Sequence, residues 1–434
     1  MPIMNTVISG GGVTPTGTKN ITTNGVHDVA GYANADVQVP TTAPALYREF
    51  QLDGTGKLIS NTTTTHIMDF TGMTDVSNYA LASAYKGNTA VSGAVDMSDL
   101  TTVTGSSACS YMFQSCRGLT SANLSSLTTI SGSSACSYMF YGCRGMTSVD
   151  LSSLTTVSGS SGAERMFGDC NHLISVDLSS LTTVNGGSGC ASMFNGCTSV
   201  TNIDVSSLTT VSGTYGCSYM FAQNKMTSVD LHSLSVVSGY AGCQYMFVSC
   251  SLVTSVDLSS LTTISSDTGC YNMFQGCTGL TSVDLPSLSN VKGKNACQNM
   301  FDGCRSLTRL SFYALTPSSF GSYTNQFNNM LQGVTGCTVH FPMAIQSKIG
   351  SWADVTNGFG GTNTTVLFDI VTTITGADTN SYTRKQKDST PTATAWEYNS
   401  TVYYTSGTAE PVVGDTIYSD DACTTAVTTI SSIA

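Results

Sequence analysis

Hydrophobic positions in the middle of the chain follow two spacings that alternate regularly. In residues 109–116, Cys-Ser-Tyr-Met-Phe-Gln-Ser-Cys, the apolar side chains fall at i, i+3, i+4 and i+7, which predicts one face of a short helix. In residues 147–151, Thr-Ser-Val-Asp-Leu, the valine and leucine point one way and the aspartate the other, as in a half-buried strand. Residues 154–157, Leu-Thr-Thr-Val, add two more inward apolar positions.

This unit recurs along most of the chain at a nearly fixed period. Eight Met-Phe pairs follow one another at intervals of 27 residues, with a single interval of 26. The methionines of these pairs are Met112, Met139, Met166, Met193, Met220, Met246, Met273 and Met300. One unit cannot bury its apolar face alone but can do so when stacked on its neighbours, so the period predicts a solenoid.

The strand part of the unit extends beyond the Met-Phe pairs in both directions. Stepping by the same period predicts eleven strands within a solenoid domain that spans residues 66–345. Their central residues are Asp69, Asp96, Asn123, Asp150, Asp177, Asp204, Asp230, Asp257, Asp284, Ser311 and His340.

The repeat resembles a known family. Its strand, Leu-Thr-Ser-Val-Asp-Leu, followed by Tyr-Met-Phe-x-Gly-Cys is similar to the BspA-like leucine-rich repeats over about residues 66–342. The resemblance implies a β-rich solenoid of leucine-rich-repeat type, with one short strand and one short helix in each coil of about 27 residues. It also implies a surface or adhesion role, and such repeats occur in structural proteins of phages from gut communities as well.

The flanking segments predict small all-β modules. We expect an N-terminal β attachment module at residues 1–40, a hairpin cap at 41–65, a C-terminal cap or linker at 346–375 with a capping helix at 345–354, and a small β module at 376–434 that contains two hairpins. The residue order of positions 21–40 resembles a segment common in tail and other virion proteins of phages that infect gut bacteria. The C-terminal module resembles the small β modules at the ends of phage fibre and tail proteins.

Composition restricts the partners. The formal net charge of −11 argues against nucleic acid and anionic membranes. No apolar run approaches 18 residues, so we expect no membrane insertion. Residues 1–12 have neither a basic nor an apolar region of the kind found in signal peptides. This favours release by virion assembly and lysis over secretion.

The cysteines raise the alternative of disulfides or zinc. Of the 16 cysteines, 14 form two ladders at equivalent positions of the repeat. Two repeats lack one partner, because Ala163 stands opposite Cys170 and Asn224 opposite Cys217. An obligatory disulfide or zinc site would not tolerate the loss, so we interpret the ladders as small buried hydrophobic side chains.

Two repeated polar features are candidate binding surfaces. The first is a stripe of aspartates, which is either a solvated face or a surface for Ca²⁺ or a basic partner. It consists of Asp69, Asp96, Asp150, Asp177, Asp204, Asp230, Asp257 and Asp284. The second is a row of tyrosines, which either lie flat on the coils or contact sugar or protein. It consists of Tyr111, Tyr138, Tyr219 and Tyr245.

No catalytic constellation is visible in the sequence, and we expect neither an enzyme nor a resident cofactor or metal apart from the candidate Ca²⁺. These features favour a non-enzymatic phage virion surface protein of fibre or receptor-binding type. It would contact other virion structural proteins and a glycan or protein on the host cell surface. A homotrimer is one assembly that the resemblance allows. The alternatives are a bacterial BspA-like cell-surface adhesin and a polysaccharide depolymerase.

Overall fold

The computed structural model describes residues 81–369 continuously, with residues 70, 74–76 and 78–79 before them and short strands on either side. The N-terminal strands are β1 (Lys19–Asn20), β2 (Val37–Gln38), β3 (Gln51–Leu52) and β4 (Leu58–Ile59). β3 and β4 pair antiparallel, which confirms the expected hairpin, whereas β1 and β2 pair parallel.

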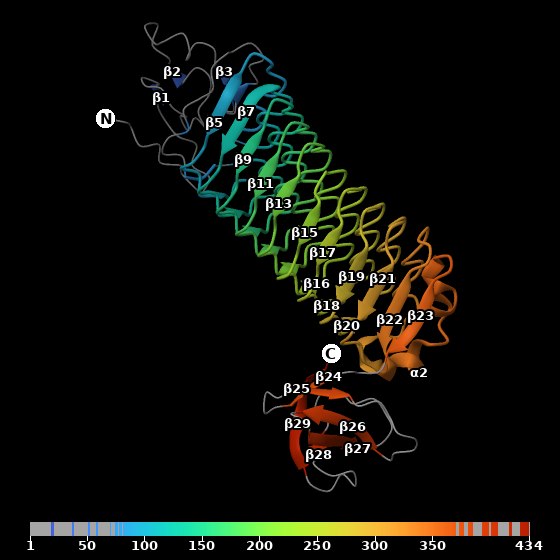
Figure 1. The fold of residues 1–434 in the computed structure, drawn as a ribbon. Helices are drawn as coiled ribbons and strands as arrows, with labels where there is room; N and C mark the ends of the chain where they lie inside the picture. Colours follow the sequence, from blue (N-terminus) through green and yellow to red (C-terminus); the bar gives the residue numbers. More distant parts are fainter. Residues whose placement is uncertain are drawn as a thin grey trace.

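The middle of the chain is a solenoid in which most coils contribute two strands (Figure 1). The first row comprises β5 (Ser92–Asp96), β7 (Gly118–Asn123), β9 (Ser148–Asp150), β11 (Ser175–Asp177), β13 (Asn202–Asp204), β15 (Ser228–Asp230), β17 (Ser255–Asp257), β19 (Ser282–Leu285), β21 (Arg309–Phe312), β22 (Thr338–Pro342) and β23 (Thr365–Asp369). The second row comprises β6 (Thr102–Val103), β8 (Thr129–Ile130), β10 (Thr156–Val157), β12 (Thr183–Val184), β14 (Thr210–Val211), β16 (Val236–Val237), β18 (Thr263–Ile264) and β20 (Asn290–Val291). The solenoid expected from the period is confirmed.

Strand pairing is parallel and follows the repeat. Asp177 is the Cα partner of both Asp150 and Asp204, so equivalent residues of successive coils lie side by side. Ten of the eleven expected strand centres lie in strands of the first row, and Asp69 lies outside the described residues. The sheet also continues past residue 345, because β23 pairs parallel with β22 and adds one more coil.

The prediction of a short helix in each coil is wrong. Residues 109–116 and their equivalents form consecutive turns instead. The Met112 N–H donates to the Cys109 carbonyl (3.1 Å), and the Cys109 N–H donates to the Ala135 carbonyl of the next coil (2.8 Å). The N–H groups therefore alternate: one donates within its own coil and closes a turn, and the next donates to a carbonyl of the neighbouring coil. This pattern satisfies the backbone without a helix. Turns that repeat every four residues place the side chains at i, i+3, i+4 and i+7 in the interior, as a helix would.

Large aromatic side chains fill the interior. The phenylalanines of the Met-Phe pairs stack on one another from coil to coil, with ring centroids 5.2–5.9 Å apart. Tyr85 begins this ladder at 5.0 Å from Phe113. Offset-stacked aromatic pairs contribute about 0.5–1.5 kcal/mol each beyond the area that they bury, so the ladder stabilises the contact between neighbouring coils.

The cysteines lie beside this ladder. All 15 cysteines within the described residues are free and buried, as expected for small hydrophobic side chains. The second of the two cysteine ladders consists of Cys116, Cys143, Cys170, Cys197, Cys250, Cys277 and Cys304. Its thiols also donate hydrogen bonds to backbone carbonyls, as Cys143 Sγ does to Phe113 O at 3.0 Å. Burial raises the pKa of the Cys197 thiol to about 12, so this group stays protonated and unreactive at neutral pH.

Short helices and a separate β module follow. The helices are η2 (Pro317–Ser319), η3 (Met343–Ile345), α2 (Gln346–Ile349), α3 (Ala353–Thr356) and η4 (Gly358–Gly360). The capping helix expected at 345–354 is thus divided into short pieces. β24 (Thr373–Gly376), β25 (Ser381–Arg384), β26 (Ala393–Tyr398), β27 (Thr401–Ser406), β28 (Thr416–Tyr418) and β29 (Ala426–Ile433) form a closed antiparallel barrel that contains both expected hairpins. Among the described residues, no helix has the length and apolar character needed to cross a membrane.

Candidate binding surfaces

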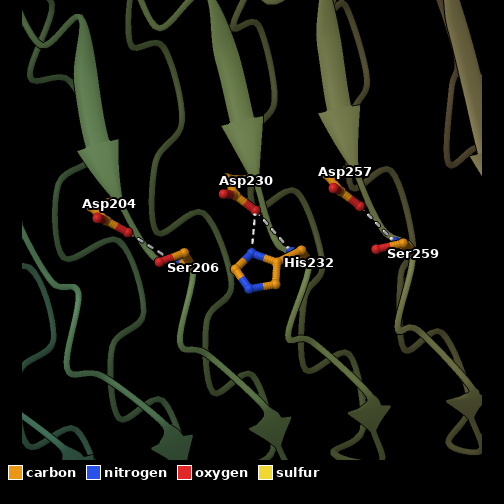
Figure 2. A network of polar contacts seen from close by, with 6 residues as sticks. All are labelled: Asp204, Ser206, Asp230, His232, Asp257 and Ser259. Atoms are coloured by element: carbon orange, nitrogen blue, oxygen red, sulfur yellow. Dashed lines mark hydrogen bonds and ion pairs between the residues drawn. The ribbon is translucent and has the colours of Figure 1, made fainter.

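From Asp96 to Asp284, the aspartates of the stripe lie at or near the ends of the first-row strands and are exposed, whereas Asp69 lies outside the described residues. Each aspartate from Asp96 to Asp257 accepts a hydrogen bond at Oδ1 from the backbone N–H two residues later, at 2.8–3.1 Å. Figure 2 shows this bond in three successive coils, at Asp204, Asp230 and Asp257. These Asx turns redirect the chain after the strand, so each carboxylate has a structural role in its own coil.

Two departures support this interpretation. Asn123 makes the same turn, accepting the Ser125 N–H at 3.2 Å, so the turn requires a side-chain oxygen and no charge. Asp284 is followed two residues later by Pro286, which has no N–H to donate. Its carboxylate instead pairs with Arg309, whose Nη1 lies 3.1 Å from Oδ1.

Local hydrogen bonds also set the charge of the stripe. The Ser179 hydroxyl and N–H lower the pKa of Asp177, and the His232 N–H lowers that of Asp230. Across the described residues, no three His, Cys, Asp or Glu side chains converge in a way that could hold a metal ion. The stripe is therefore a row of separate turns, and Ca²⁺ binding along it stays a prediction.

The tyrosine row divides into two clusters with different surroundings. In the first, Tyr111 and Tyr138 stack at 5.0 Å. Lys86 Nζ lies 4.6 Å from the centre of the Tyr111 ring, and Arg165 lies 5.7 Å from that of Tyr138. Cations thus pack against the end rings of the stack.

The second cluster, which we call the tyrosine patch, spans three coils. Tyr219 stacks on Tyr245 with centroids 4.7 Å apart, and Tyr271 meets Tyr245 edge-on at 5.4 Å. One turn earlier in the first two of these coils, Tyr215 and Tyr240 meet edge-on at 5.6 Å and are 39% and 49% exposed. Sequence reasoning found Tyr219 and Tyr245 but missed the other three, although all five stand at turn positions of consecutive coils.

Burial also changes the chemistry of the patch. Partial burial raises the pKa of Tyr219, and burial together with a hydrogen bond to Tyr271 raises that of Tyr245. These phenols therefore remain neutral at physiological pH and can donate or accept hydrogen bonds.

Comparison with known proteins places the repeat in a family. The sequence model of the BspA type leucine-rich-repeat region matches six copies, over residues 106–241, 190–308 and 243–338. No curated protein matches the chain.

Solved leucine-rich-repeat structures are distant from this chain. A Bacteroides ovatus leucine-rich-repeat protein is 17% identical over 81% of this chain and 92% of its own, with a TM-score of 0.36. The Toll–Spatzle complex of Drosophila contains a chain that is 12% identical over 63% of this chain and 42% of its own (TM-score 0.25). A Leptospira interrogans leucine-rich-repeat protein is 11% identical over 63% and 73% (TM-score 0.20). Because the family matches together cover more than half of the sequence, the chain belongs to the BspA-type leucine-rich-repeat family.

Proposed function

We propose that the protein is a non-enzymatic adhesion scaffold, exposed on a particle or cell surface. It would bind partners on the turn face of its solenoid, which is formed by the consecutive turns at residues 109–116 and their equivalents in the other coils. The observation that carries this proposal is the tyrosine patch on a rigid backbone. Tyrosine supplies a large contact area at a low cost in side-chain entropy, which is why it is enriched in binding surfaces.

Rigidity of the turn face supports the same function. The Ser218 N–H donates to Tyr215 O of the same coil (3.1 Å), and the Tyr219 N–H donates to Gln244 O of the next coil (3.0 Å). The patch is therefore fixed by hydrogen bonds within and between coils. A preorganised surface loses less conformational entropy on binding, and more of the contact energy appears as affinity.

The setting that we propose is a phage virion. Its support is the resemblance of residues 21–40 to segments of phage tail and virion proteins, and the partners would be other virion proteins and a glycan or protein of the host surface. A bacterial cell-surface adhesin is the second candidate, because the BspA-type match covers most of the solenoid and fits that role equally well. Immunogold labelling of lysates and intact cells distinguishes them: label on tailed particles supports the virion, and label on cell envelopes supports the adhesin.

Binding itself is tested with purified full-length protein on a panel of intact gut bacteria. Selective binding to some strains is the expected result, and binding to none contradicts the proposal. The same panel, assayed for loss of capsule, tests the non-enzymatic part, since capsule degradation would show a depolymerase. Repeating the assay with a chelator tests whether Ca²⁺ on the aspartate stripe takes part.

A further inference from the structure

The repeat provides an internal comparison for each tyrosine of the patch. At the position of Tyr215 the four preceding coils carry serine, namely Ser107, Ser134, Ser161 and Ser188. Tyr215 nevertheless adopts the same left-handed backbone as these serines, with φ of 54° against 50–52°. The turn therefore does not require an aromatic residue, and the fold does not explain why this coil has one.

The same holds for the stacked pair. Tyr219 has φ of 56° and Tyr245 of 55°, while Ser192 and Asn272 occupy the equivalent turns of neighbouring coils with φ of 54° and 53°. Asparagine tolerates this conformation best among residues other than glycine, whereas tyrosine gains nothing from it. The backbone geometry of the solenoid therefore does not require aromatic side chains at these two positions.

The patch also differs from the first tyrosine cluster in what covers its rings. Lys86 and Arg165 lie against the rings of Tyr111 and Tyr138. On the side of Tyr219 that faces the preceding coil, the equivalent residue is Ser192, whose side chain is too short to cover a ring. Among the described residues, no aromatic ring or cation of that coil packs on Tyr219, whose ring stacks on Tyr245 on the other side.

Charge is sparse around the patch. The turn segments 187–196, 214–223 and 240–249 contain no Asp, Glu, Lys, Arg or His, although the protein carries a net charge of −11, and the turn segment 267–276 that carries Tyr271 adds one charged residue, Asp267. What they present is phenol hydroxyls, the amides of Gln223 and Gln244, and small polar residues. An anionic partner would lose solvation here without gaining an ion pair, and a cationic partner could pair only with Asp267.

We infer that the tyrosine patch binds an uncharged polysaccharide. A pyranose ring has a face of C–H groups that packs on an aromatic ring, and an edge of hydroxyls that hydrogen-bond to phenols and amides. A chain of sugars lying along the solenoid axis would meet successive coils, which are stacked at about 4.8 Å as in a parallel sheet. This inference rests on the proposed function and adds the chemistry and the location of the partner.

The test is affinity electrophoresis of the full-length protein in gels that contain dextran, mannan or laminarin, with polygalacturonate as the acidic comparison. Three proteins are compared: wild type, the patch variant Tyr215→Ser/Tyr240→Ser, and the control Tyr111→Ser/Tyr138→Ser. Each substitution introduces serine, which other coils of the chain carry at the matching position, for example Ser160, Ser188 and Ser192, so the fold is retained. Thermal unfolding of all three verifies this.

We expect at least one neutral polysaccharide to retard wild type and the control alike, with about tenfold weaker retardation of the patch variant. Equal retardation of the patch variant overturns the inference, and so does retardation by polygalacturonate alone. A wild-type protein that binds cells but is retarded by none of the neutral polysaccharides also overturns it, and then points to a protein partner. Failure to bind any cell counts instead against the proposed function.

Discussion

Close backbone contact between coils predicts a large effect from one methyl group. At Gly186 an added Cβ would lie 2.2 Å from the carbonyl oxygen of Gly159 in the preceding coil and 2.8 Å from its carbonyl carbon. Gly132, Gly159, Gly213 and Gly239 have the same contact with the coil before them, at 2.1–2.2 Å. This glycine ladder lets the backbones of adjacent coils approach as closely as the stacked phenylalanines require.

Relief of the clash in Gly186→Ala is expensive because both backbones are held. The Gly159 carbonyl accepts the Gly162 N–H at 3.0 Å, and the Gly186 carbonyl accepts the Gly189 N–H at 2.9 Å. Overpacking costs about 1–3 kcal/mol, whereas replacing glycine by alanine returns about 0.4–1 kcal/mol from the unfolded state. Since the obstacle is backbone, we place the cost at the upper end and expect a net loss of about 2 kcal/mol.

The neighbouring glycine is the matched control. A Cβ at Gly187 would meet nothing closer than 3.9 Å, so Gly187→Ala should leave stability unchanged or raise it by up to about 1 kcal/mol. Urea unfolding followed by circular dichroism compares the two variants with wild type. Equal midpoints for Gly186→Ala and Gly187→Ala would refute the argument from backbone contact.

A natural exception gives a second comparison. Ser266 occupies the ladder position in one coil, where its Oγ donates to the Gly239 carbonyl at 2.6 Å. The turn bond from Gly269 N–H to Ser266 O is 3.4 Å, the same length as the bond from Ala108 N–H to Gly105 O in a coil with glycine at this position, so the coil accommodates the side chain without losing the turn. We therefore expect Gly186→Ser to destabilise less than Gly186→Ala in the same unfolding assay, because its hydroxyl adds a hydrogen bond that offsets part of the cost of the Cβ contact.

Substitutions at three further residues test individual side chains. Burial raises the pKa of Asp354 to about 6, and its Oδ2 has no hydrogen-bond partner. Stability is therefore lost as pH rises through about 6. Asp354→Asn should raise the free energy of unfolding, measured in urea, by about 2 kcal/mol at pH 7.5 and leave it unchanged at pH 4. The lowered pKa of Asp177 means that its contribution is present above the ordinary aspartate pKa and is lost in more acidic solution. Asp177→Asn should remove this small pH dependence and keep the turn, whereas Asp177→Ala should cost about 0.5–1 kcal/mol at pH 7. Asn224 buries both amide atoms without partners in the second cysteine ladder, so Asn224→Cys should stabilise by about 1–3 kcal/mol in urea unfolding, and an unchanged midpoint would show that the amide is satisfied in solution.

The sequence predicted the solenoid, its period and its strands because each depends on a pattern that stacking enforces. Residues 148–150 alternate outward and inward, and ten expected strand centres lie in strands of one row. The Met-Phe segment was misread because apolar spacing alone does not distinguish a helix from turns that repeat every four residues. The distinguishing signal was present in residues that tolerate positive φ, namely Gly142, Gly276 and Asn299.

The candidate surfaces were predicted with unequal success for a physical reason. A residue that recurs in every coil, such as the aspartate after the strand, performs a task that every coil has, here the Asx turn. Tyr215 and Tyr240 do not recur, and for that reason a search for repeated features passed over them. In a solenoid the average residue at each position reports the requirements of the fold, and a large exposed departure from it reports something that the fold does not need. The tyrosine patch is such a departure, extended over three consecutive coils, and it is therefore the surface where binding is to be tested first.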